Sequence, residues 1–295
     1  MAFTYEFIIN LGIFLLAAMG LMIIFGLMGI INMAQGEFIM LGAYVSSYAI
    51  IKLGAPFFAG VIAAFVVVAL LGVVVERCII RWLYGDIIMG LVATWGLSLF
   101  ISGGVLLLWG PAGPPVAIPV DGHLSVGEQN YGVYSMLLCV IALVSLVGLY
   151  QLLQRSQWGT ELRATIYDRD TAAALGIRTD FINVTGFALG AGLGGAAGAL
   201  LAPLSALTPT MGGTYLPIAF ITVVVAGSSH IVSSLLMASM VLALAFTLGI
   251  HNSNALIGLF CMLGTALVII RVTPKGLADR VTDIQSAFNR ILKPS

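Results

Sequence analysis

The sequence predicts an all-α polytopic membrane protein, and three observations lead to that fold class. Hydrophobic residues make up 60 % of the 295 positions, charged residues make up only 8 %, and the mean hydropathy is +1.11. A soluble domain devotes about a quarter of its residues to charge, so this chain lacks the charged side chains that would cover a water-exposed surface. The charges also fall between long apolar runs, and residues 181–270 contain none.

The apolar runs divide into several predicted membrane segments. A helix needs about 20 apolar residues to cross the hydrocarbon core, which predicts about nine (8–10) crossings here. With boundaries at charges and at Gly, Pro and polar breaks, the segments are residues 8–30, 36–51, 56–75, 88–108, 132–153, 181–202, 215–228, 232–249 and 255–271. The second and the seventh are short, so we expect a re-entrant or broken helix at each.

The positions of Lys and Arg predict the orientation, because cytoplasmic loops carry an excess of both. Nine crossings with an external N-terminus place eleven of the twelve Lys and Arg residues in the cytoplasm and leave only Lys52 outside. We therefore expect a multi-pass protein of a bacterial-type inner membrane, with its N-terminus outside and its C-terminus in the cytoplasm.

Residues 1–273 are expected to form one transmembrane domain, followed by a cytoplasmic tail over residues 274–295. Apolar residues recur in the tail at the period of one helix face: Leu277, Val281, Ile284, Phe288 and Ile291. This pattern predicts an amphipathic helix, lying either on the anionic surface of the membrane or against a partner subunit.

Several function classes are excluded by what the chain lacks. Its twelve basic and twelve acidic residues balance, so no basic excess favours nucleic acid. The three Cys and three His residues are scattered, which supports neither a disulfide framework nor a metal site. No phosphate-binding loop, H-E-x-x-H or G-x-S-x-G motif is present. We expect no catalytic residue and no cofactor bound by this chain.

The second predicted segment begins with unusual polar residues. Asn32, Gln35 and Glu37 lie between two apolar runs that no linker separates. A carboxylate at membrane depth costs about 2.5–3.5 kcal/mol on insertion scales, so Glu37 should face protein or a water-filled cavity. These three residues are candidates to line a solute pathway. The alternative is a tight cytoplasmic turn in which Glu37 is a helix-start charge at the lipid surface.

Two other places add candidates for the pathway. Thr94, Trp95 and Ser98 bring two hydroxyls and an indole into the apolar fourth segment. Hydroxyls in membrane helices often bond to their own i−4 carbonyl, which is the alternative here. Tyr215 opens the short seventh segment after a Gly-Gly pair; its alternative is an aromatic residue at the membrane interface.

Glycine recurs every fourth residue in the sixth segment, at Gly186, Gly190, Gly194 and Gly198. Residues at this spacing share one helix face, and small residues there allow two helix backbones to approach closely. A G-x-G-x-x-G match in the same stretch is not preceded by a strand, so it is not a dinucleotide site. We predict a tightly packed helix pair.

One cytoplasmic loop, at about residues 155–180, is dense in both charge signs. It is helical in composition, it ends at a plausible helix stop, and Ala172 to Leu175 offer a small apolar knob. These features favour docking into a groove on another protein, with a solvated loop as the alternative. The candidate docking residues are Glu161, Arg163, Ala164, Asp168, Arg169, Ala172, Leu175 and Gly176.

These motifs resemble those of a known family. Asn32 to Glu37 resembles the N-[FM]-A-H-G-E motif of ABC-transporter permeases for branched-chain amino acids and for urea or short amides, with Gln35 where His is usual. The loop from Gly159 to Ile177 is similar to the cytoplasmic loop of that family, and Pro274 to Leu277 is similar to its P-x-G-L ending. Residues 83–85 and 93–99 look more like the urea-type branch.

The resemblance implies a permease subunit of an ATP-driven importer that works by alternating access. Its partners would be a homologous second permease subunit, two cytoplasmic ATPase subunits that bind ATP and Mg²⁺, and an extracytoplasmic solute-binding protein. Residues 155–180 would couple this chain to the ATPases. The scarcity of charge favours a neutral or zwitterionic solute, with urea or a short amide preferred over a branched-chain amino acid.

Two other functions stay open at this stage. A self-contained channel or secondary transporter would explain the membrane segments but would leave the docking loop without a role. A structural membrane subunit would need no polar pathway.

Overall fold

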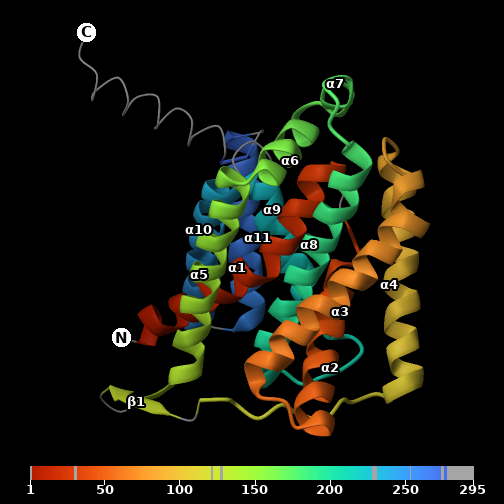
Figure 1. The fold of residues 1–295 in the computed structure, drawn as a ribbon. Helices are drawn as coiled ribbons and strands as arrows, with labels where there is room; N and C mark the ends of the chain where they lie inside the picture. Colours follow the sequence, from red (N-terminus) through yellow and green to blue (C-terminus); the bar gives the residue numbers. More distant parts are fainter. Residues whose placement is uncertain are drawn as a thin grey trace.

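The computed structural model describes residues 2–29, 32–120, 122–126, 129–227, 231–252, 254–273 and 276–277. These residues form one bundle of helices (Figure 1). The described helices of the bundle are α1 (Ala2–Met28), α2 (Gln35–Leu53), α3 (Phe57–Cys78), α4 (Ile87–Trp109), α5 (Val133–Arg155), α8 (Thr179–Leu201), α9 (Met211–Ala226), α10 (Ile231–Asn252) and α11 (Ala255–Val272). Each of the nine predicted segments therefore coincides with a helix.

Not every helix of the bundle meets the length and composition expected of a membrane crossing. Among the described residues, seven helices are long and apolar enough to cross a membrane, and α9 is a shorter apolar helix. The seven do not include α2, which carries Glu37 and Lys52. The structure thus confirms an all-helical membrane fold, while the count of nine crossings stays a prediction.

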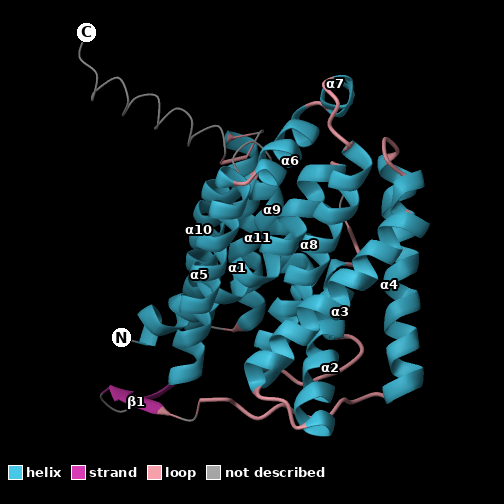
Figure 2. Cartoon of the chain, viewed as in Figure 1, coloured by secondary structure: helices cyan, strands magenta, loops and turns pink. Residues whose placement is uncertain are grey.

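Smaller elements lie at the two ends of the bundle (Figure 2). Helices α6 (Gln157–Tyr167) and α7 (Arg169–Ala174) lie at one end, and two short 3₁₀ turns cover Ile80–Trp82 and Ala202–Leu204. At the opposite end, β1 (His123–Val126) and β2 (Gln129–Gly132) form a small antiparallel hairpin. The hairpin lies in the connection between α4 and α5.

The middle of the bundle is formed by α1 and α8. In each of them 72 % of the apolar stretch is buried, compared with 17 % in α4 and in α11. Helix α1 packs on α5, α8, α9 and α10, while α8 packs on α1, α2 and α3. The contacts of α1 with α9 and α10 therefore mirror those of α8 with α2 and α3.

Glycines allow the helices of the two halves to approach each other closely. A Cβ atom on Gly36 would lie 2.5 Å from the carbonyl oxygen of Gly212, and a Cβ atom on Gly212 would lie 2.5 Å from that of Gly36. Gly20 and Gly190 oppose each other in the same reciprocal manner. Because real Cβ atoms essentially never approach so closely, the crossings of α1 with α8 and of α2 with α9 both require glycine.

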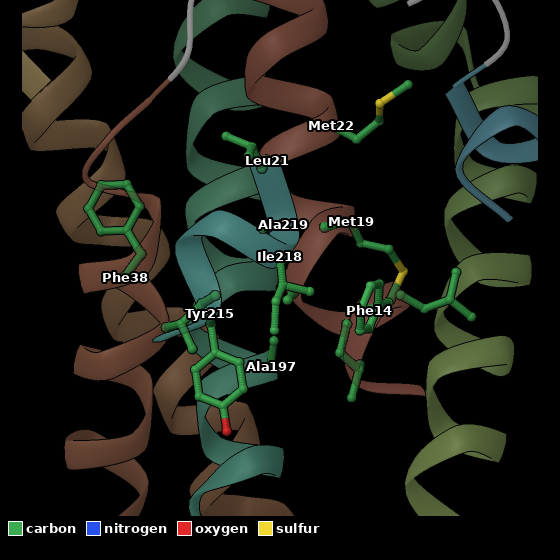
Figure 3. Packing of buried hydrophobic residues seen from close by; sticks show 14 of the residues in the cluster. Phe14, Met19, Leu21, Met22, Phe38, Ala197, Tyr215, Ile218 and Ala219 are labelled. Carbon is green, nitrogen blue, oxygen red and sulfur yellow. The ribbon is translucent and has the colours of Figure 1, made fainter. Parts of the chain in front are cut away.

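Large apolar side chains fill the space around these crossings (Figure 3). Phe14, Met19 and Met22 come from α1, and Ile218 and Ala219 come from α9; each is at most 8 % exposed. The same core includes Phe38 of α2 and Ala197 of α8.

One observation at each end of the chain concerns the predicted orientation. The N-terminal end of α1 lies at the opposite end of the bundle from α6 and α7 (Figure 1). Leu277 donates its N–H to the carbonyl oxygen of Val225, at the C-terminal end of α9. Most of the tail, including Val281, Ile284, Phe288 and Ile291, lies outside the described residues, so the amphipathic tail and the cytoplasmic assignment stay predictions.

Candidate functional site

The polar start of α2 is enclosed by protein. Asn32 and Gln35 are 0 % exposed and Glu37 is 7 % exposed. Gly36 touches the first turn of α9, and the amide of Gln35 reaches the middle of α8. Glu37 therefore lies inside the packed bundle rather than on its surface, although it stands in the first turn of a helix, as the alternative expects.

In each of the two side-chain amides of this segment, one polar atom has a hydrogen-bond partner. Asn32 Oδ1 accepts the N–H of Ala34 at 3.1 Å, and Gln35 Nε2 donates to the carbonyl oxygen of Gly190 at 3.5 Å. Asn32 Nδ2 and Gln35 Oε1 have no hydrogen-bond partner in the described part of the chain. A buried donor or acceptor without a partner costs about 1–3 kcal/mol, so both atoms have capacity to bind a polar solute or water.

Helix α4 meets this segment through two hydroxyls. Ser98 Oγ donates to Glu37 Oε1 at 3.0 Å, and Thr94 Oγ1 accepts the N–H of Met33 at 3.2 Å. The second carboxylate oxygen, Glu37 Oε2, is buried and finds no partner among the described residues. The structure thus joins two groups of candidates that lie about 60 positions apart in the sequence.

The other two pathway candidates lie elsewhere. Trp95 is 60 % exposed on the outer side of α4, so it does not join Thr94 and Ser98. Tyr215 is 9 % exposed, and its hydroxyl lies 3.0 Å from Ser205 Oγ in the connection between α8 and α9. Figure 3 shows the Tyr215 ring packed among the core residues.

The four glycines of α8 face α1 and α2 in sequence order. The closest neighbours of a Cβ atom would be Leu27 at Gly186, Gly20 at Gly190, Gln35 at Gly194 and Ile39 at Gly198. At Gly194 the neighbouring atom is Gln35 Nε2, at 2.6 Å. The glycine face therefore both packs the helices and forms the wall against which the polar start of α2 lies.

The charged loop at residues 155–180 forms two helices, α6 and α7, where the sequence predicts one. Asp168 separates them, because its backbone is extended and its carboxylate accepts the N–H groups of Asp170 and Thr171, each at 3.0 Å. The N–H and hydroxyl of Thr171 hold the pKa of Asp168 below its ordinary value. Asp168 is thus the N-cap of α7.

The outward surface of this loop differs from the predicted knob. Ala172 is only 2 % exposed and faces the bundle, so it cannot insert into a partner. Tyr167 and Leu175 are 94 % and 77 % exposed, and Gly176 follows with a φ of 88° that ends α7. Sequence reasoning missed Tyr167; the available signal was an aromatic residue at the end of a charged amphipathic helix.

The remaining loop candidates surround this surface. Glu161 and Asp168 are exposed, and Ala164 is half-buried. Arg163 donates to Gln154 and Thr160, while Arg169 pairs with Asp180. No cluster of three or more His, Cys, Asp or Glu in the described ranges is placed to hold a metal ion.

Comparisons with known proteins agree with this architecture. Residues 3–272 match the family described as "Branched-chain amino acid transport system / permease component". The chain is 28 % identical over 200 residues to the high-affinity branched-chain amino acid transport system permease protein BraD of Pseudomonas aeruginosa, an alignment covering 63 % of this chain and 65 % of BraD. It is 28 % identical over 202 residues to the corresponding protein LivH of Escherichia coli, with the same coverage.

A third relative aligns over a longer stretch. The probable branched-chain amino acid transport permease protein LivH of Methanocaldococcus jannaschii is 25 % identical over 279 residues, which cover 88 % of each chain. The chain spans 65 % of the length of BraD and of the Escherichia coli protein. No solved structure matches it. This multi-pass membrane protein belongs to the family of branched-chain amino acid transport system permease components.

Proposed function

We propose that this chain is the permease subunit of an ATP-driven importer for an aliphatic, zwitterionic amino acid. The observation that carries the proposal is the start of α2, where Glu37 Oε2 and Asn32 Nδ2 are a buried acceptor and a buried donor without described partners. A permease needs only a difference in solute affinity between its two conformations, and such groups can supply it.

The two ends of a zwitterion suit these two groups. Glu37 Oε2 would accept from the ammonium group, while Ser98 holds the other carboxylate oxygen. Asn32 Nδ2 would donate to the solute carboxylate. The relatives named above are branched-chain amino acid permeases, and this moves our proposal away from the urea or short amide that the sequence motifs favoured.

Energy would enter through α6 and α7. Exposed Tyr167 and Leu175 form an apolar surface that suits insertion into a groove of an ATPase subunit. Two such subunits would bind ATP and Mg²⁺, and a homologous permease and an extracytoplasmic binding protein would complete the assembly. This chain itself would do no chemistry, in keeping with its family of transport proteins.

The test is uptake of labelled leucine and labelled urea into vesicles that contain the complete assembly, with and without ATP. We expect leucine uptake that requires ATP, and little urea uptake. Changing both Tyr167→Asp and Leu175→Asp should abolish uptake by preventing docking. Tyr167→Phe, which keeps the exposed ring, is the matched control and should retain uptake.

Each rival function gives a different result. Leucine uptake that is the same without ATP and in the double variant would indicate a channel. Urea uptake in place of leucine uptake would indicate a permease for urea or a short amide. Uptake that survives Glu37→Ala together with Asn32→Ala would leave a structural subunit without its own pathway.

A further inference from the structure

Helix α4 is attached to the rest of the chain at few places. Only 17 % of its apolar stretch is buried, and among the described elements it packs mainly on α2. Figure 1 shows it at the edge of the bundle. It makes polar contacts to the turn before α2, through Thr94 and Met33, and to α2 itself, through Ser98 and Glu37. A displacement of α4 would therefore act directly on the polar start of α2.

The second attachment of α4 lies at its N-terminal end, in the loop of residues 83–86 that precedes it. The guanidinium carbon of Arg169, the first residue of α7, lies 4.9 Å from the centroid of the Tyr84 ring. The Tyr84 hydroxyl donates to Glu76 Oε1 at 3.2 Å, and Arg169 also pairs with Asp180 at 3.2 Å. Glu76 is 2 % exposed, which fixes the ring to α3.

This contact differs from the others made by the loop. Arg178 also lies over an aromatic ring, that of Phe181 at 5.7 Å, but both residues belong to the start of α8. Tyr167 and Leu175 point away from the bundle. Arg169 alone among these four side chains joins α7 to the segment that begins α4.

We propose that Arg169 and Tyr84 form the contact through which movement of α6 and α7 is transmitted to α4, and from there to the solute-binding start of α2. The inference rests on the proposed function. Arg169 is a positioning residue, because its guanidinium lies over the Tyr84 ring, and α4 is the element whose two positions it would bias. A cation–π contact of partly exposed side chains can bias such an element about two- to fivefold between two positions.

The first test measures the number of leucine molecules taken up per ATP hydrolysed by the reconstituted assembly. We expect Arg169→Gln and Tyr84→Leu each to lower this ratio about threefold or more, while ATP hydrolysis continues. Arg178→Gln removes a ring contact that lies within the start of α8 and should retain the ratio. The double variant of Arg169→Gln and Tyr84→Leu should be no worse than either single variant, because both remove one contact.

A second measurement does not depend on transport. Spin labels at Leu107 on α4 and Val144 on α5, which are 88 % and 66 % exposed, report the position of α4. ATP should change the distance between the labels in the otherwise unchanged assembly and in Arg178→Gln, but not in Arg169→Gln.

The outcomes separate this inference from the proposed function. An unchanged uptake ratio in Arg169→Gln, single effects that multiply in the double variant, or an α4 position that ignores ATP would overturn the inference while ATP-dependent leucine uptake stands. Leucine uptake that does not require ATP in the unchanged assembly would instead overturn the proposed function.

Discussion

The starts of α2 and α9 occupy matching places in the bundle but differ in chemistry. Both follow a reversal of the chain, and they meet at Gly36 and Gly212. At α2, Asn32, Gln35 and Glu37 each keep one buried polar atom without a described partner. At α9, the hydroxyl of Tyr215 is paired with Ser205.

This difference shows that the glycine contacts between helices and the polar groups of the candidate site are separate features of one architecture. The reciprocal glycine contacts serve both halves of the chain equally. Only the α2 half meets α4, whose Thr94 and Ser98 bring hydroxyls to the polar segment. We therefore expect changes at the α2 start to affect transport, and changes at the glycine contact to affect stability in both halves.

The largest expected effect on transport is at Glu37. Replacing Glu37 by Ala removes a buried acceptor of a charged group, and such hydrogen bonds are worth about 1.5–3 kcal/mol. Leucine uptake should fall about tenfold to a hundredfold at equal amounts of assembled protein. Uptake within twofold of the unchanged protein would show that Glu37 does not contact the solute.

Substitutions on the two sides of the contact between Gly36 and Gly212 should lower the stability of the protein equally. Gly36→Ala and Gly212→Ala each place a Cβ atom 2.5 Å from the opposite carbonyl oxygen. We expect each to lower the free energy of unfolding by about 1–3 kcal/mol, as overpacking does. Gly213→Ala is the matched control, because nothing lies within 4 Å of its Cβ position. Thermal unfolding in detergent measures all three, and a stable Gly212→Ala would break the symmetry.

A smaller effect is expected at Tyr215. Tyr215→Phe removes the hydrogen bond to Ser205, which should cost about 0.5–1.5 kcal/mol of stability. Leucine uptake by the assembled protein should change less than twofold, because this hydroxyl is already paired. A loss of uptake as large as that of Glu37→Ala would indicate that the solute contacts the starts of both α2 and α9.

The smallest effect concerns pH at α7. The pKa of Asp168 is lowered in the folded chain by the N–H and hydroxyl of Thr171, so its cap stabilises α7 above the ordinary carboxyl pKa. That stability is lost as the pH falls through the lowered value. The protection factors of the Asp170 and Thr171 amides, taken relative to an unfolded chain at the same pH, should therefore fall only in acid, and Asp168→Ala should show low protection at every pH. Protection that does not fall in acid in the unchanged protein would argue against the cap.

The sequence predicted the helices well because their signals are local. Apolar runs and breaks located all nine segments, and the polar residues at positions 32–37 marked the start of α2. The meeting of Glu37 with Ser98 was not predictable, since the packing of α4 on α2 decides it. The same holds for the exposure of Trp95 at the edge of the bundle.

The errors in the charged loop have a local and a tertiary cause. The helical composition of residues 155–180 predicts a single helix, but the Asp168 carboxylate competes for backbone N–H groups and starts a second helix. Ala172 was placed outward because the turn of α7 against the bundle could not be read from spacing.

The most direct measurement is the binding of labelled leucine to the assembly in lipid nanodiscs, with 4-methylpentanoate as competitor. The competitor has the shape and carboxylate of leucine but lacks the ammonium group, so only an acceptor such as Glu37 Oε2 separates the two. We expect the unchanged protein to prefer leucine strongly and Glu37→Ala, which removes the acceptor, to lose that preference. The same preference in both proteins would contradict solute binding at the start of α2.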